Sequence, residues 1–157
     1  YMPATLGTRG KWCESKVRGA LKDLSVNQGF NFMRLPDARA GSFTPTTADF
    51  LVGHKTPYRR KAWMLEAKEV EHEFRLPRKN YPQDQRSRVR SWEMAGFESL
   101  VVVAFLPLKG AAYKATTPMF RATNLAYFTG DDTSSWDMRD LPLLTLAQAL
   151  TPLTNLP

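Results

Sequence analysis

Two acidic side chains and one lysine lie on neighbouring strand-like segments of this chain. Asp49 lies in the segment Ala48–Val52, and Glu66 and Lys68 lie in the segment Ala62–Val70. Side chains two residues apart on a strand share a face, so Glu66 and Lys68 point the same way, and Asp49 can face them if the strands pair. One or two carboxylates suffice to anchor Mg²⁺. The pattern therefore predicts a metal-dependent phosphodiesterase site.

Further groups can complete this site. The backbone carbonyl of Ala67 would add a third protein oxygen for the metal. Lys68 would orient or help deprotonate the attacking water and stabilise charge developing on phosphorus. Glu14 lies at the margin of the apolar face of an expected helix, from which it would complete the metal shell or bind a second ion. We expect Mg²⁺ as the cofactor, with Mn²⁺ as a substitute.

Each of these residues also has a simpler explanation. The pattern Glu-x-Lys alone is weak, because Glu14-Ser15-Lys16 matches it on a helix, where such residues do not face each other. Asp49 could be a strand-end carboxylate that caps a turn, and Glu66 could be a solvated residue on an edge strand. Placement of the residues on adjacent strands, in a basic part of the chain, favours the ligand interpretation.

Positive charge dominates the chain and points to a nucleic-acid substrate. Lys and Arg outnumber Asp and Glu by 22 to 15, for a net charge of +7 and a pI of about 9.8, which is typical of nucleic-acid binders. Much of this charge falls close in sequence to the candidate site, so we expect a phosphate backbone to lie there. The expected DNA contacts are Arg9, Lys11, Thr47, Arg59, Arg60, Lys61, Arg75, Arg78, Lys79 and Arg86.

The elements that must position these side chains can be read from apolar spacing and from Pro and Gly. Their order, αβββαβ, predicts an α/β fold with a central mixed sheet flanked by helices. The expected elements are helix Lys11–Leu24, strands Phe30–Leu35, Ala48–Val52 and Ala62–Val70, helix Gln83–Met94 and strand Leu100–Leu106. We expect a turn through Gly53 and Pro57, short edge strands within Tyr113–Phe128, a polar loop over Gly130–Asp140, and a helix over Leu146–Leu150 with Thr145 as its N-cap.

Composition narrows the class of protein. A chain of 157 residues with 43% hydrophobic residues predicts one globular domain, with a core over about 10–128 and a C-terminal helix and tail over 141–157. The chain contains no apolar run of 18 residues, which argues against a membrane span. The single cysteine, Cys13, excludes an internal disulfide, and the first residues lack a secretory pattern. We therefore expect a soluble, cytoplasmic protein.

The sequence resembles a known family. Glu14, the run Thr47-Ala48-Asp49-Phe50 and the tripeptide Glu66-Ala67-Lys68 resemble the PD-(D/E)xK nuclease superfamily, and the details resemble its RecU-type Holliday junction resolvases. Phage and archaeal resolvases share the same core residues. In the RecU type a Pro-rich and Asn-aromatic segment leads to a helix bearing a glutamine, which here reads Leu76-Pro77-Arg78-Lys79-Asn80-Tyr81-Pro82-Gln83-Asp84-Gln85. The resemblance spans roughly 10–105.

The resemblance implies a restriction-endonuclease-like core and a role for each motif residue. By this resemblance Asp49 and Glu66 bind metal, Lys68 assists the nucleophile, Gln85 is an active-site helix residue, and Glu14 belongs to the catalytic cluster. It also implies a homodimer that nicks opposed strands of a four-way DNA junction, an activity used in DNA recombination and repair.

The chain departs from the RecU-type pattern in two places. Asp84 stands where His is common, and the segment between Arg34 and Thr46 is short for the stalk that such enzymes insert into a junction.

The sequence therefore predicts a magnesium-dependent endodeoxyribonuclease that resolves four-way junctions. Two alternatives stay open. One is a duplex DNA endonuclease directed by sequence or lesion on the same core. The other is a non-catalytic nucleic-acid-binding domain, in which basic loops and the aromatics Tyr58, Tyr81 and Trp92 contact DNA.

Overall fold

A five-stranded mixed sheet forms the centre of the protein. The computed structural model describes residues 11–36, 47–106, 116–130 and 133–155. The sheet has the strand order β1-β2-β3-β5-β6, in which β3 and β5 run parallel and the other neighbours antiparallel. Its strands are β1 (Phe30–Arg34), β2 (Phe50–Lys55), β3 (Arg60–Val70), β5 (Glu98–Phe105) and β6 (Phe120–Thr123). The predicted α/β class with a mixed sheet flanked by helices is confirmed.

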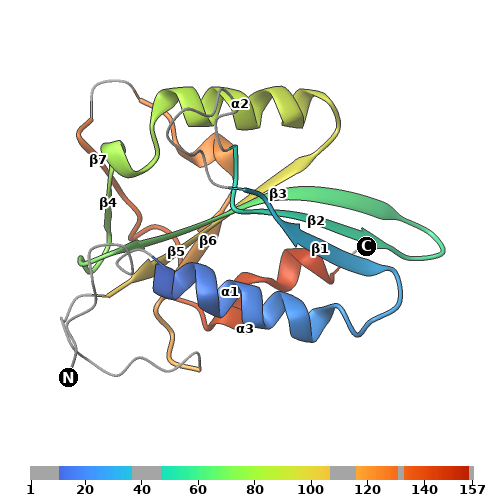
Figure 1. The fold of residues 1–157 in the computed structure, drawn as a ribbon. Coiled ribbons are helices and arrows are strands. Elements are labelled where there is room, and N and C mark those ends of the chain that lie inside the picture. Colours follow the sequence, from blue (N-terminus) through green and yellow to red (C-terminus); the bar gives the residue numbers. More distant parts are fainter. Residues whose placement is uncertain (1–10, 37–46, 107–115, 131–132, 156–157) are drawn as a thin grey trace.

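Helices cover both faces of this sheet (Figure 1). The helices α1 (Lys11–Leu24) and α3 (Leu146–Ala149) lie on one face, and α2 (Gln83–Met94) lies on the other. Alternate residues of the central strands point to opposite faces. The α1 side of the core includes Val17, Leu21, Phe50, Leu65 and Val102. The α2 side includes Leu76, Tyr81, Val89, Val101 and Val103. Because apolar side chains pack on both faces, β3 and β5 are held rigidly at the centre.

The two long helices agree with the sequence prediction at both ends. The first spans Lys11–Leu24 and the second spans Gln83–Met94. The predicted helix near the C-terminus is also present, one residue shorter, and Thr145 caps it in a capping box with Gln148. Within the described residues, no helix has the length and apolar character to cross a membrane.

The hairpin of β2 and β3 is longer than predicted. The strand β2 starts at Phe50 and runs through Gly53, which pairs with neighbours on both sides. The predicted turn through Gly53 and Pro57 is therefore wrong at Gly53. The turn lies at Thr56–Arg59, which includes Pro57, and there the Thr56 backbone N–H donates to the Arg59 carbonyl at 2.7 Å. Figure 1 shows this hairpin projecting beyond the helices. Glycine without a side chain fits inside a ladder, so its presence alone does not mark a turn.

The prediction of a polar loop over Gly130–Asp140 is wrong in part, because some of these residues form one strand of a second, two-stranded sheet. The strand β7 (Ser135–Asp137) pairs antiparallel with β4 (Arg75–Pro77). Three-residue strands are too short to give a periodic signal, which is why the sequence did not predict them. Of the predicted edge strands, β6 is present at Phe120–Thr123, and residues 107–115 lie outside the described part of the chain.

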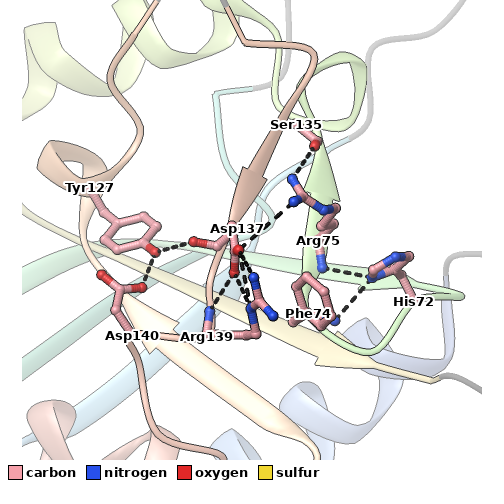
Figure 2. A network of polar contacts seen from close by, with 8 residues as sticks. All are labelled: His72, Phe74, Arg75, Tyr127, Ser135, Asp137, Arg139 and Asp140. Carbon is pink, nitrogen blue, oxygen red and sulfur yellow. Dashed lines mark hydrogen bonds and ion pairs between the residues drawn. The ribbon is translucent and has the colours of Figure 1, made fainter.

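Polar contacts hold the outer surface of this small sheet (Figure 2). The Arg75 guanidinium donates to the Ser135 hydroxyl at 3.3 Å and lies 3.9 Å from the Asp137 carboxylate. Arg139 also donates to Asp137, and this hydrogen bonding lowers the pKa of Asp137 to about 2. The network therefore gives Arg75 a structural role in joining β4 to β7.

Candidate active site

The strand register places Asp49 beside Glu66, where the β2–β3 ladder ends. Phe50 pairs with Leu65, and the Asp49 backbone N–H donates to the Leu65 carbonyl at 3.1 Å. The neighbouring residue, Glu66, is therefore opposite Asp49. The charge of Glu66 raises the pKa of the Asp49 carboxyl, so the two groups lie close together. The structure therefore brings these two acids together from adjacent segments, and their role as metal ligands stays a prediction.

The backbone of β3 beyond this point is not covered by β2. The Ala67 backbone N–H, which faces the place of the missing neighbour, donates to Asp49 Oδ2 at 2.8 Å. Asp49 therefore does serve as a strand-end cap, as one alternative held, but at a position where it also meets a second carboxylate. In a strand the N–H and C=O of one residue point to the same neighbour. We therefore expect the Ala67 carbonyl oxygen to face the same gap.

Glu66 is buried at the centre of the site. Its Oε1 lies 3.1 Å from Lys68 Nζ, and its Oε2 accepts from Gln85 Nε2 at 3.0 Å. Gln85 also donates to the Thr47 carbonyl at 3.2 Å, which ties α2 to the segment that precedes Asp49. The alternative that Glu66 is a solvated edge residue is wrong, because β3 has a neighbour on each side and Glu66 is only 6% exposed.

Burial strongly perturbs both acids. Loss of solvent and the nearby charge of Glu66 raise the pKa of Asp49 to about 8, although the Ala67 N–H and the charge of Lys68 act in the opposite direction. Burial also raises the pKa of Glu66, against the opposing effects of Lys68 and Gln85. Glu66 is buried, Asp49 is half-buried, and Lys68 supplies only one ammonium group beside them. Ionisation of both acids therefore needs a further cation. The pair therefore favours either a proton or a bound cation.

Tyr81 is a site residue whose role the sequence did not reveal. Its ring is fully buried beneath Lys68, whose Nζ lies 5.2 Å from the ring centroid. Burial and the charge of Glu66 raise the pKa of its hydroxyl, which has no hydrogen-bond partner in the described ranges. The apolar ring face restricts where the lysine ammonium can lie. No local pattern signals this contact, because Tyr81 and Lys68 meet only through the fold.

Glu14 lies near the carboxylate pair but is engaged elsewhere. Its negative charge contributes to the raised pKa of Asp49. Its Oε1 accepts a hydrogen bond from Arg34 Nε, and the Arg18 guanidinium lies 3.7 Å from the same oxygen. The start of α1 is fixed by Glu69, whose Oε1 accepts from the Cys13 N–H at 3.0 Å. Membership of Glu14 in a metal shell stays a prediction.

The basic residues of the hairpin lie away from the carboxylates. Arg60 pairs with Lys55 at the far end of the ladder from Asp49. Six residues at about 3.3 Å each separate the two ends by roughly 20 Å. Arg59 and Arg60 are exposed, and Lys61 is partly so and lies 3.8 Å from Glu98. These basic residues are close to the site in sequence but not in space. Contact of Arg59, Arg60 and Lys61 with DNA stays a prediction.

The remaining predicted DNA contacts are dispersed. Arg78 donates to the carbonyls of Gly130 and Thr133, and Arg86 donates to the carbonyls of Tyr81 and Phe128, so both hold loops together. Lys11 and Lys79 are exposed, and Thr47 is half-buried beside Gln85. Arg9 lies outside the described residues. The DNA contacts of all these residues stay predictions.

The described residues contain no group of three or more His, Cys, Asp or Glu side chains that could hold a metal ion. Comparison with protein-family models and with curated proteins gives no match for this sequence.

Proposed function

We propose that this protein is a magnesium-dependent endodeoxyribonuclease with a restriction-endonuclease-like core that resolves four-way DNA junctions as a homodimer. The observation that carries the proposal is the pair of half-buried Asp49 and buried Glu66, brought together where the β2–β3 ladder ends, with Lys68 3.1 Å from Glu66. The net charge of +7 supports a polyanionic substrate. The choice of a junction rests on the resemblance to RecU-type resolvases.

The donor set fits a hard divalent cation. Mg²⁺ is commonly held by one or two carboxylates and keeps several waters, so Asp49, Glu66 and the Ala67 carbonyl would suffice. The raised pKa of Asp49 indicates that the one ammonium group beside Glu66, that of Lys68, does not compensate both acids. A bound cation would supply a Lewis acid that polarises a phosphate oxygen and acidifies a water molecule. Mn²⁺ has similar ligand preferences and should substitute.

The protein groups around the acids have separate tasks. Lys68 provides a fixed ammonium group for the attacking water or for charge that develops on phosphorus. Its position is set by Glu66 and by the ring of Tyr81. Gln85 donates to Glu66 and so restricts the rotation of that carboxylate. Groups that orient a ligand in this way commonly affect metal affinity and rate together.

Cleavage of a synthetic four-way junction, compared with linear duplex of matched sequence, tests the substrate. We expect Mg²⁺-dependent nicking of the junction in large preference to the duplex. Equal cleavage of both would exclude the junction proposal and favour a duplex endonuclease. Two measurements test the proposed homodimer. We expect both nicks to be made within the lifetime of one protein–junction complex, and we expect the protein to sediment as a dimer.

The variant Asp49→Asn tests the chemistry. It removes one ligand charge with almost no change in shape, so cleavage should be abolished while binding to the junction survives. Asp84→Asn is the matched control, because Asp84 is an exposed carboxylate that pairs with Arg88 at 3.4 Å on α2. Undiminished cleavage by Asp49→Asn would refute the assignment. Binding without any cleavage by the unmodified protein would favour the non-catalytic alternative.

A further inference from the structure

A hollow in the surface lies between α1 and the end of β1. Lys11, Glu14, Ser15 and Arg18 line it from the helix, and Arg34 lines it from the strand. Its volume of about 260 Å³ can hold several waters, since each water occupies about 30 Å³ of liquid. Three cationic side chains against one carboxylate give the lining a net positive charge. The hollow is thus suited to an anion.

The guanidinium groups of Arg34 and Arg18 both lie beside Glu14, and hydrogen bonds hold that of Arg34 in place. Arg34 Nε donates to Glu14 Oε1, and its NH1 donates to the Leu35 carbonyl at 2.9 Å. Arg18 lies 3.7 Å from the same Glu14 oxygen. The Arg18 guanidinium carries five N–H donors, and its side chain is 44% exposed. Fixing the side chains in advance reduces the entropy lost on binding.

The hollow adjoins the candidate active site. The Leu35 backbone N–H, next to Arg34, donates to the Asp49 carbonyl at 2.8 Å. The charge of Glu14 is close enough to affect Asp49. A nucleic-acid strand whose phosphate reaches Asp49 and Glu66 would therefore bring an adjacent phosphate near Arg18 and Arg34.

We propose that this hollow binds a backbone phosphate of the substrate strand, adjacent to the phosphate that is hydrolysed. Arg18 and Arg34 provide the charged donors, with Lys11 and Ser15 at the rim. Glu14 then acts as a positioning residue that holds both guanidinium groups. The inference rests on the proposed function, because it assumes that a nucleic-acid strand enters the carboxylate site. It adds a phosphate contact made by Arg18 and Arg34, which the sequence did not single out.

Binding measurements on the full chain carrying Asp49→Asn test the hollow without cleavage. Arg18→Ala removes a side chain that is 44% exposed, so folding should be unaffected. Arg34→Lys keeps the charge but loses the paired donors. The matched control is Lys16→Ala, which removes one charge from α1 outside the hollow, at a side chain that lies over the Trp12 ring. The ligand is a four-way junction with one neutral methylphosphonate placed in turn at each position near the cleavage point.

We expect Arg18→Ala to weaken junction binding about tenfold and to lower the slope of log affinity against log salt by about one unit. At one methylphosphonate position the protein with native Arg18 should lose about tenfold in affinity, and Arg18→Ala should lose less than twofold there. Arg34→Lys should also weaken binding. Lys16→Ala should bind the junction as tightly as the protein that carries Asp49→Asn alone.

Two results would overturn the inference. One is an Arg18→Ala affinity within twofold of the Lys16→Ala control. The other is a methylphosphonate profile that is identical with and without Arg18. Cleavage by protein with native Asp49 is measured in parallel. If Mg²⁺-dependent cleavage is normal and the binding profile is unchanged, only the proposed phosphate binding by the hollow is excluded. If cleavage is absent, the proposed function is excluded.

Discussion

Replacing Asp49 by Asn should stabilise the metal-free protein at neutral and alkaline pH. The carboxyl of Asp49 is half-buried beside Glu66, and its pKa is raised from 3.8 to about 8. The amide of Asn has nearly the same shape, can still accept from the Ala67 N–H, and carries no charge. The variant therefore removes an electrostatic penalty while it keeps the hydrogen bond that caps the strand.

The direction of the pH dependence follows from proton binding. Below pH 3.8 the carboxyl of Asp49 is protonated in both the folded and the unfolded chain. Between pH 3.8 and about 8 the folded chain retains a proton that the unfolded chain releases, so the free energy of unfolding falls as pH rises. One pKa unit corresponds to about 1.4 kcal/mol. Even half of this shift would amount to about 3 kcal/mol at pH 8, which is a large share of the stability of a small domain.

Urea denaturation at pH 5, 6, 7 and 8, in EDTA and in Mg²⁺, measures this effect. In EDTA the free energy of unfolding of the native protein should fall toward pH 8, and that of Asp49→Asn should fall much less. Mg²⁺ should restore stability to the native protein and not to the variant, because ligand binding to the folded state stabilises it. Asp84→Asn, at an exposed carboxylate, should behave like the native protein.

A variant that is less stable than the native protein at pH 8 in EDTA would refute this reasoning. It would mean that the Asp49 charge is already compensated within the fold. A pH dependence that is unchanged in Asp49→Asn would likewise place the titrating group elsewhere.

Three further predictions concern the lysine, the glutamine and one glycine. Lys68→Met should lower the rate of junction cleavage by about 10²–10⁴-fold, whereas Lys16→Met should not, and equal rates for both would exclude a catalytic lysine. Gln85→Ala should weaken Mg²⁺ affinity or lower activity by about 10–100-fold, as measured by Mg²⁺ titration of cleavage, and an unchanged titration would leave Gln85 with only a structural role. Gly29→Ala should destabilise the fold by about 1–3 kcal/mol, because Gly29 has φ +86° and an added Cβ would lie 2.2 Å from the Lys55 carbonyl oxygen; a native urea midpoint would contradict this.

The sequence predicted the parts of the fold that depend on local patterns. The helix at 83–94 lies between Pro82, which favours a helix start, and Gly96, which adopts φ +103° just after its end. Strand geometry predicted that Glu66 and Lys68 share a face, whereas the position of Asp49 opposite them depends on the register of the β2–β3 hairpin. Short strands such as β4 and β7 carry too few residues to show a period.

Contacts between distant segments could not be predicted in the same way. Arg34 and Glu14 are twenty residues apart in sequence and form an ion pair. This ion pair occupies Glu14, a predicted metal ligand, and both residues line the hollow. The basic run at Arg59–Lys61 follows the site closely in sequence, yet the length of the hairpin carries it about 20 Å away. Such placements depend on strand length and helix packing, which residue types do not specify.

Diffraction from crystals soaked in Mn²⁺, recorded for its anomalous signal, tests the central claim most directly. We expect an anomalous peak for a Mn²⁺ ion that is bound by the carboxylates of Asp49 and Glu66. The Ala67 carbonyl should be among its ligands, and Lys68 should lie beside it. The same experiment on Asp49→Asn should show the peak weakened or lost. A strong peak at other residues, with none between these two acids, would contradict the account.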